Sequence, residues 1–184
     1  MEQTNLQRRK WLSLGGIILG ASLLPNLASA IVSTPKPMVL RLRRASTGET
    51  LSAGYSAGSF AAKDRSRLNY IMRDVHVDRV KNIDPQLFVK LTQIQSRLGA
   101  RNAEITILSG YRSAQTNARL RRRSRGVASN SYHILGKAID FHIEGIPLAK
   151  VRNAAESLSN GGVGYYPRSN FVHVDTGPVR TWRG

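Results

Sequence analysis

The sequence predicts an α+β fold, in which helices pack on one side of an antiparallel sheet. Short segments with alternating apolar and polar residues recur along the chain and are typical of half-buried strands. One longer segment, residues 84–98, instead repeats its apolar residues at helical spacing. A turn-like Ala45–Gly48 separates the first two strand-like segments, which favours a hairpin and hence antiparallel pairing.

The first half of the domain is predicted to contain a hairpin and two helices. The helix over 84–98 is the clearest, because Asp84 supplies an N-cap, Pro85 suits the first helical position and Gly99 ends the periodic run. In chain order we expect a strand over 38–43, a turn over 45–48, a strand over 49–55, a helix over 65–75 and a helix over 84–98.

The second half is predicted to supply the rest of the sheet. Alternation along residues 137–143 places Ala138, Asp140 and His142 on one face of a strand and apolar side chains on the other. In chain order we expect a strand over 104–108, a helix over 113–123 with Ser113 as N-cap, a strand over 137–143, a helix over 147–158, and strands over 163–166 and 171–175.

The N-terminus has the three parts of a secretory signal peptide. A basic Arg8-Arg9-Lys10 is followed by an apolar stretch over 11–24 and by Ala28-Ser-Ala30. We expect residues 1–30 to be removed near Ala30 and the protein to act in the periplasm. The adjacent arginines favour the twin-arginine export route, and a general signal peptide is the alternative. A linker over 31–37 and a single domain over 38–184 would follow.

Composition narrows the class of partner. The net charge of +17 attracts polyanions, and for an exported protein these are the cell wall and anionic lipid headgroups. Export argues against nucleic acid as the partner. The apolar stretch is too short for a membrane span. We expect no stable membrane insertion once the signal is cleaved. The chain has no cysteine, so its core must provide stability without disulfides. We expect a monomer.

Three residues form a candidate metal site. His133 and Asp140 lie seven residues apart, and His173 follows near the C-terminus. Two imidazoles and one carboxylate leave a coordination position open, as catalytic zinc sites do, whereas structural sites use four ligands and usually thiolates. A salt bridge to arginine is the alternative role of Asp140. The pattern favours a catalytic Zn²⁺ site.

The motifs around these residues resemble those of the zinc peptidases related to D-Ala-D-Ala carboxypeptidases and lysostaphin, within a branch of murein endopeptidases. The similarity spans residues 36–184 and rests on Ser109-Gly-Tyr-Arg112, Gly126-Val-Ala-Ser129, Ser131-x-His133-x-x-Gly136-x-Ala138-x-Asp140, Gly161-Gly-Val-Gly-Tyr-Tyr-Pro167 and His173-Val-Asp-Thr-Gly177. The resemblance implies that His133, Asp140 and His173 bind zinc and that Arg112 lies at the active site. One departure matters: many relatives have a catalytic Glu where this chain has Asn170.

The identity of the general base is therefore open. Asp175 shares the strand face of His173, and His142 shares that of Asp140, so both are expected near the metal. We expect Asp175 to be the base, with orientation of a histidine ring as its alternative role. His142 is the second candidate, or a plain surface histidine. Arg112 is expected to bind substrate or stabilise an oxyanion, and a structural salt bridge is its alternative.

The favoured function is hydrolysis of peptide cross-links in peptidoglycan, and the resemblance implies the diaminopimelate–diaminopimelate (3-3) link. A D-Ala–diaminopimelate endopeptidase, a stem-peptide carboxypeptidase and a non-catalytic cell-wall-binding module are the alternatives. Two further groups have open roles. The basic run of Arg119, Arg121, Arg122, Arg123 and Arg125 either binds the wall or forms a solvated helix face. Tyr165, Tyr166 and Trp182 either line a peptide groove or pack in the interior.

Overall fold

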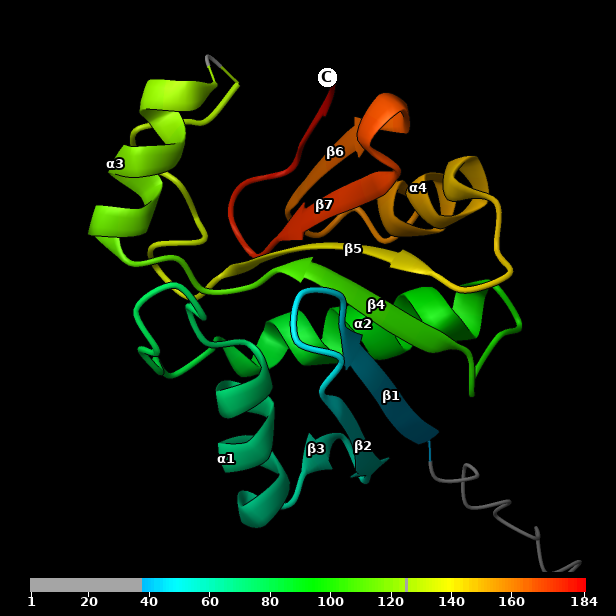
Figure 1. The fold of residues 1–184 in the computed structure, drawn as a ribbon. Coiled ribbons are helices and arrows are strands. Elements are labelled where there is room, and N and C mark those ends of the chain that lie inside the picture. The colour runs from blue at the N-terminus through cyan, green and yellow to red at the C-terminus, as the bar shows by residue number, and fades with distance from the viewer. Residues whose placement is uncertain (1–37, 125) are drawn as a thin grey trace, which may run out of the picture. The chain divides into compact units, whose positions relative to one another are not determined.

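A computed structural model of the chain describes residues 38–124 and 126–184. The expected signal peptide, its cleavage site and the linker lie outside these residues. Among the described helices, none combines the length and apolar character needed to cross a membrane. Residues 38–184 otherwise contain the α+β fold that the sequence predicts (Figure 1).

Eight strands form one sheet in the order β3-β2-β1-β4-β5-β7-β6-β8. Most neighbouring strands are antiparallel, and the two parallel pairs are β1 with β4 and β6 with β8. The strands are β1 (Met38–Arg44), β2 (Thr50–Ser56), β3 (Ser59–Phe60), β4 (Glu104–Ser109), β5 (Ala138–Ile143), β6 (Gly162–Tyr166), β7 (Phe171–Asp175) and β8 (Arg180–Arg183).

Four helices connect the strands, and two of them begin at the side-chain caps that the sequence indicates. Asp84 accepts a hydrogen bond from the backbone N–H of Gln86, and Ser113 accepts one from that of Thr116. The helices are α1 (Ala62–Ile71), α2 (Pro85–Arg97), α3 (Ala114–Arg123) and α4 (Leu148–Glu156), with a 3₁₀ turn η1 over Pro167–Ser169.

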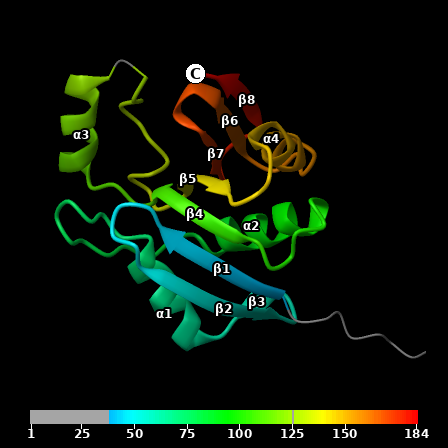
Figure 2. The same cartoon turned by 45° about the vertical axis from the view of Figure 1, so that its right-hand side comes forward.

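The core lies between one face of the sheet and helices α1, α2 and α4. Fully buried aliphatic side chains from α2, such as Leu87 and Leu91, join Ile105 of β4 and Ile139 of β5 in one cluster. Helix α3 stands to one side of the sheet, away from α2 and α4, in both cartoon views (Figures 1 and 2). The predicted packing of helices on one face is therefore confirmed for α1, α2 and α4. Helix α3 lies at the side of the sheet.

The predicted elements are present, with shifted ends and two omissions. Helix α1 covers Ala62–Ile71 rather than 65–75, because the backbone carbonyl of Met72 leaves the helix and accepts a tertiary hydrogen bond from Tyr111. The sequence does not predict β3 and β8. Strand β3 has two residues and β8 has four, so neither is long enough to show a period. Each becomes a strand only by pairing with a longer neighbouring strand, β3 with β2 and β8 with β6.

Candidate metal centre

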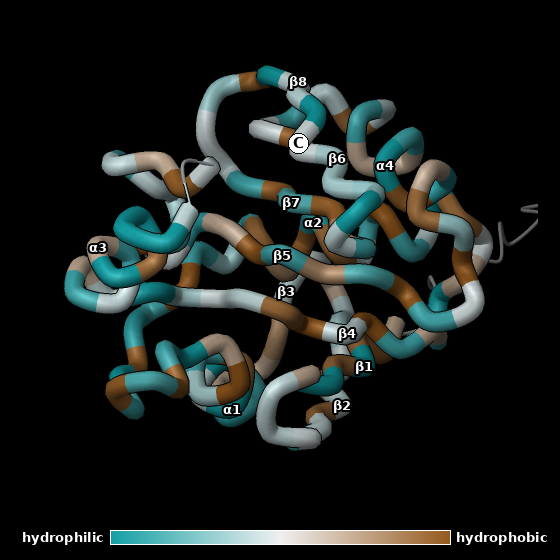
Figure 3. Tube along the Cα trace, turned by 45° about the horizontal axis from the view of Figure 1, so that its top comes forward, coloured by the Kyte–Doolittle hydropathy of each residue, from teal (hydrophilic) through white to brown (hydrophobic). Residues whose placement is uncertain are grey.

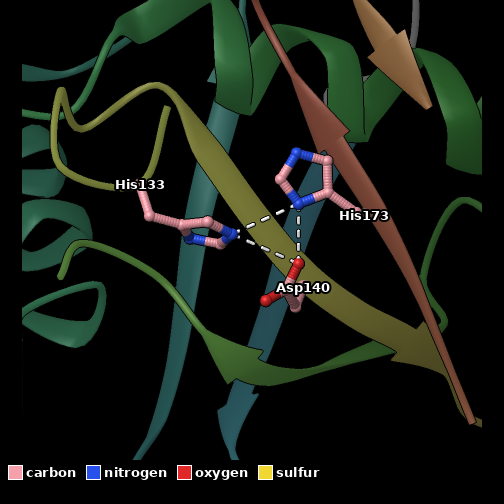
Figure 4. Close-up of side chains that lie close together, drawn as sticks. All are labelled: His133, Asp140 and His173. Atoms are coloured by element: carbon pink, nitrogen blue, oxygen red, sulfur yellow. Dashed lines mark hydrogen bonds and ion pairs between the residues drawn. The ribbon is translucent and has the colours of Figure 1, made fainter. Parts of the chain in front are cut away.

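His133, Asp140 and His173 point toward one another at the sheet, and they come from three different segments (Figure 4). Asp140 lies on β5, His173 lies on β7, and His133 lies on the loop before β5. All three side chains are buried. The structure thus brings together the three residues that the sequence predicts as metal ligands.

The register of the sheet explains why two of the three meet. Strands β5 and β7 pair so that Asp140 stands directly opposite His173. Residues opposite each other in an antiparallel pair have side chains on the same face, a few ångströms apart. The intervening residues, among them Ile139 and Val172, point into the core and are fully buried. Figure 3 shows this alternation along both strands.

The loop that carries His133 depends on two glycines. Gly136 has φ of +70°, and a Cβ there would lie 2.8 Å from the carbonyl oxygen of Asn82, so a larger residue would meet both strain and a clash. At Gly110 a Cβ would lie 2.5 Å from the carbonyl oxygen of Met72. The approach at Gly136 packs the His133 loop against Asn82, and the approach at Gly110 packs that residue, whose carbonyl oxygen the His133 ring contacts, against Met72.

The spacing of the three side chains fits a small divalent cation. Nδ1 of His173 lies 2.7 Å from Oδ1 of Asp140, and Nε2 of His133 lies 3.2 Å from each of those two atoms. Ligands of a tetrahedral zinc ion, bound at about 2.0–2.1 Å, are about 3.3 Å apart. Two nitrogens and a carboxylate oxygen are also ligand types that zinc accepts.

The far side of each imidazole is occupied by a hydrogen-bond acceptor. Nδ1–H of His133 donates to the carbonyl oxygen of Gly110 at 2.7 Å, and Nε2–H of His173 donates to Oδ2 of Asp175 at 3.1 Å. A proton held there leaves the lone pair of the other ring nitrogen directed at the centre of the trio. Acceptors in this position are typical of metal-binding histidines, because they select the tautomer and orient the ring.

Electrostatics also favour a cation at this point. Burial lowers the pKa of His133, which keeps its imidazole neutral and able to bind a metal. Burial raises the pKa of Asp140, but the charge and hydrogen bonds of the two imidazoles outweigh this effect and hold the pKa well below its usual range. Burial lowers the pKa of His173, but hydrogen bonds to Asp140 and Asp175 outweigh it and raise the pKa. Positive charge beside the Asp140 carboxylate is therefore stabilised, while the His133 imidazole stays neutral.

Asp175 lies behind His173, on the side of the ring that faces away from the trio. It is fully buried. Its carboxylate accepts from the backbone N–H groups of Gly162 and Gly177 at 3.0 and 2.8 Å, and from both terminal nitrogens of Arg180 at 3.1 and 2.6 Å. Burial raises its pKa, but these hydrogen bonds and that of His173 lower it more strongly. This is the arrangement expected of the alternative role, orientation of the histidine ring.

Arg112 reaches the trio from the segment between β4 and α3. Its NH2 group donates to Oδ2 of Asp140 at 2.9 Å, and its Nε–H donates to Oγ of Ser109 at 2.9 Å. The guanidinium therefore binds the carboxylate oxygen that does not face the histidines. It also lines the cleft above the trio, so Arg112 forms the salt bridge and faces the cleft at the same time.

His142 and Asn170 lie apart from the trio. Nε2 of His142 is 3.1 Å from a carboxylate oxygen of Glu144, and the histidine does not line the cleft. Asn170 is exposed and has φ of +52° at the end of η1. Asparagine tolerates this left-handed conformation, whereas glutamate rarely adopts it. The conformation of the turn between β6 and β7 thus suits asparagine at this position.

A cleft of about 780 Å³ opens above the trio. One wall is the end of α3 with the loop over 126–130, and the opposite wall is β8 with the turn between β6 and β7. Trp182 and Tyr166 line this second wall, and Nε1–H of Trp182 donates to the Tyr166 hydroxyl at 2.8 Å. Tyr165 packs against the core instead. Two of these three aromatic residues thus line the cleft, and the third packs against the core.

Two residues at the cleft have no predicted role in the sequence. Arg180 lies between the rings of Tyr132 and Trp182, with its guanidinium carbon 4.9 and 5.0 Å from their centroids, while it binds Asp175. His76 lines the cleft from the loop between α1 and α2. Neither belongs to a short motif with the ligands, and only the folded chain brings them to the site.

The fold and the site define a protein of the metallopeptidase class: an α+β sheet that carries a buried His–Asp–His set beneath an open cleft. Comparison with protein families places the chain within that class. Residues 32–182 match the family described as peptidoglycan L,D-endopeptidase MepK. The chain belongs to this family, and it is an enzyme.

Individual relatives agree with this assignment. The chain is 60% identical, over the full length of both proteins, to the probable peptidoglycan L,D-endopeptidase MepK of Haemophilus influenzae. It is 50% identical to the peptidoglycan L,D-endopeptidase MepK of Escherichia coli K12, across 99% of this chain and 100% of that protein. No solved structure matches the chain.

Proposed function

We propose that the protein is a zinc-dependent endopeptidase that hydrolyses peptide cross-links of peptidoglycan, and that its preferred bond is the diaminopimelate–diaminopimelate (3-3) link. The observation that carries the proposal is the convergence of three acceptor atoms, 2.7–3.2 Å apart, at the floor of an open cleft. The choice of bond is supported by relatives whose name specifies an L,D-endopeptidase.

In this proposal His133, Asp140 and His173 hold the metal, and their neighbours keep them in place. A zinc ion bound there supplies a Lewis acid that polarises the scissile carbonyl and activates water near neutral pH. Gly110 and Asp175 hold the two imidazoles in the tautomers that binding requires. No reorganisation of the ligands is then needed when the substrate arrives.

Arg112 has two roles in the same proposal. Its bond to Asp140 keeps one carboxylate oxygen directed away from the histidines and leaves the other directed at them. Because the guanidinium also lines the cleft, it is placed to donate to a substrate oxygen on which negative charge develops. The salt bridge thus holds a charged donor at the reaction site before the substrate binds.

The aromatic wall supports a peptide as the substrate. The Trp182 ring lies against that of His173, with centroids 5.2 Å apart, and the stacked Tyr166 and Phe171 rings lie beside it. Flat apolar surfaces next to a metal site can hold the chain on either side of the scissile bond, while hydrogen-bond donors fix its orientation. A cleft open to solvent also suits an internal bond in a cross-linked substrate.

The proposal is tested by mass analysis of muropeptides after incubation with the purified protein, with and without chelator. We expect 3-3 dimers to disappear and uncross-linked stems of unchanged length to accumulate, with activity lost on chelation and regained with zinc. If only the D-Ala–diaminopimelate dimers disappear, the enzyme has that specificity in place of the proposed 3-3 specificity. Shortened stems with intact dimers would indicate the carboxypeptidase alternative.

We also propose that the protein is exported through the twin-arginine route and acts in the periplasm, with residues 1–30 as its signal peptide and residues 38–184 as its peptidase domain. The support is the sequence of the N-terminus, which lies outside the described residues. Replacement of Arg8 and Arg9 by lysine should stop export by that route. If this variant reaches the periplasm at wild-type levels, the twin-arginine assignment is wrong and the N-terminus acts as a general signal peptide.

A further inference from the structure

Hydrolysis of an amide needs a group that accepts a proton from water and returns one to the leaving amine. Carboxylates and imidazoles do this near neutral pH, whereas arginine and tyrosine side chains do not accept protons there. The described residues that line the cleft include four side chains of the first kind: His76, His133, Asp140 and His173. Three of these are the proposed metal ligands. His76 is left over.

The two candidates that strand alternation suggests do not occupy this position. Asp175 faces the far side of the His173 ring, and five hydrogen bonds from four donor residues surround its carboxylate. His142 pairs with Glu144 outside the cleft. Neither side chain lines the space in which a substrate would lie.

His76 is held over the cleft by a tight loop. The backbone of Asp74 exchanges two hydrogen bonds with that of Arg79, at 3.0 and 3.1 Å, which closes the base of the loop. The His76 ring belongs to an exposed residue at its tip. The loop therefore presents an imidazole to the cleft and to solvent, while hydrogen bonds hold its backbone in place.

The same loop is fastened to the segment that carries Arg112. Asp74 is buried, and its carboxylate accepts from the backbone N–H of His76 at 3.0 Å and from that of Ser113 at 2.8 Å. Ser113 directly follows Arg112, and the N–H of Tyr111 donates to the carbonyl oxygen of Met72 at 2.8 Å. Two independent contacts thus hold the His76 loop beside the arginine that binds Asp140.

We propose that His76 is a catalytic residue that transfers the proton during peptide hydrolysis. The inference rests on the proposed function and supplies the general base that it lacks. The oxygen of water adds to the scissile carbonyl carbon, and the imidazole takes one of its protons. The C–N bond then breaks while the imidazole passes that proton to the departing nitrogen. One water and one amide give one carboxylic acid and one amine, and His76 returns to its initial state.

The test compares His76→Gln with wild type on a soluble 3-3 cross-linked muropeptide dimer. Glutamine retains hydrogen bonding but cannot carry a proton. We expect kcat to fall roughly a hundredfold or more, the usual scale for loss of a general base, while KM changes by less than about threefold. Zinc content should match that of wild type. The pH–rate profile should lose the limb that reports protonation of the base.

Two further variants make the result decisive. In His76→Ala, added imidazole should restore part of the rate, which a purely structural role of His76 would not allow. His142→Gln is the matched control, because it removes an imidazole that does not line the cleft, and it should stay within about twofold of wild type. The thermal midpoint of each variant checks that the fold is intact.

Other outcomes overturn the role of His76. These are a His76→Gln variant with a kcat within tenfold of wild type and an unchanged pH profile, a defect in KM alone, or a His76→Ala variant that does not respond to imidazole. They would leave the proposed function standing. A wild-type protein that does not cut the dimer, or that cuts it equally well after exhaustive chelation, would instead overturn the proposed function and the role of His76 together.

Discussion

Two clusters of charged and polar side chains in the described part of the chain differ in how their hydrogen-bonding groups are directed. The first, near β1, β2 and α1, pairs each carboxylate with a donor: Arg73 binds Glu49 at 3.0 Å and Asp78 at 2.7 Å. The second, at β5 and β7, directs two imidazole nitrogens and a carboxylate oxygen at one point. The first cluster is complete without a ligand, whereas the second gains stability from a cation.

The difference shows which feature of a buried polar cluster indicates chemistry. The presence of a buried charged residue does not separate the two clusters, since Arg73 and Asp140 are 8% and 7% exposed, although the carboxylates that bind Arg73 are more exposed. Neither does charge, because both contain ion pairs. The separating feature is the direction of the lone pairs. Alternating donors and acceptors neutralise each other, but converging acceptors need a positive partner that the protein itself does not supply.

The largest effect is expected at the converging acceptors. His133→Ala, Asp140→Ala and His173→Ala should each remove the metal and reduce muropeptide hydrolysis below detection, because two ligands cannot hold zinc against water. Metal content and hydrolysis are measured on the same preparations, with His142→Ala as the matched control. Full activity in any of the three variants would contradict the difference drawn between the two clusters. The trio would then be a structural cluster like the one around Arg73.

Asp175→Asn is expected to have the next largest effect. An amide orients the His173 ring less firmly than a carboxylate, so zinc affinity should fall roughly 10–100-fold and excess zinc should recover part of the activity. Zinc titrations of wild type and variant measure this change. A base role for Asp175 would look different: zinc would bind normally and kcat would fall roughly a hundredfold.

Glu49→Gln probes the paired cluster. A side-chain hydrogen bond from Arg73 lowers the pKa of Glu49 below its ordinary value of 4.5. The ionised form therefore stabilises the fold above the unfolded-state pKa, and this contribution is lost as the pH falls through the lower folded-state pKa. Because Glu49 is partly exposed and its ion pair is screened by solvent, we expect the variant to lower the free energy of unfolding by less than about 1 kcal/mol at pH 7. The difference from wild type should disappear in acid.

Denaturant unfolding at pH 7 and below pH 3 measures this effect. Hydrolysis per folded molecule should not change, because the cluster is complete without a ligand and lies outside the cleft. Glu156→Gln is the control, since Glu156 forms only a long contact of 3.9 Å with Arg152 at the surface of α4. A loss of activity in Glu49→Gln would show that the two clusters are coupled.

The smallest effect is expected from the exposed charges of α3. Arg121, Arg122 and Arg123 lie in the last turn of the helix that flanks the cleft. Neutralising all three should weaken binding to purified sacculi and make the remaining binding less sensitive to salt, because exposed charges are screened. Cleavage of small soluble muropeptides should be unaffected. Sedimentation at low and high salt distinguishes this from a merely solvated helix face, for which binding would not change.

Local sequence was enough to predict most of the elements, and the resemblance to zinc peptidases singled out the three residues that the structure brings together. The helix α2 has a cap, a proline and an apolar period within fifteen residues, and alternation along β5 and β7 places the side chains of Asp140 and His173 away from the core. These features rest on interactions between residues close in the chain, or on the period of two that any strand imposes.

Which residues surround the ligands was decided by tertiary structure. Alternation put Asp175 on the same face as His173, but only the ring orientation and the approach of Arg180 from β8 put it behind the imidazole. His76 reaches the cleft through a loop whose fastening, from Asp74 to Ser113, spans 39 residues. Such contacts depend on how separate segments pack, and no periodicity in the sequence records them. The chain by itself therefore indicated the three proposed metal ligands, and the packing of distant segments decided which groups surround them.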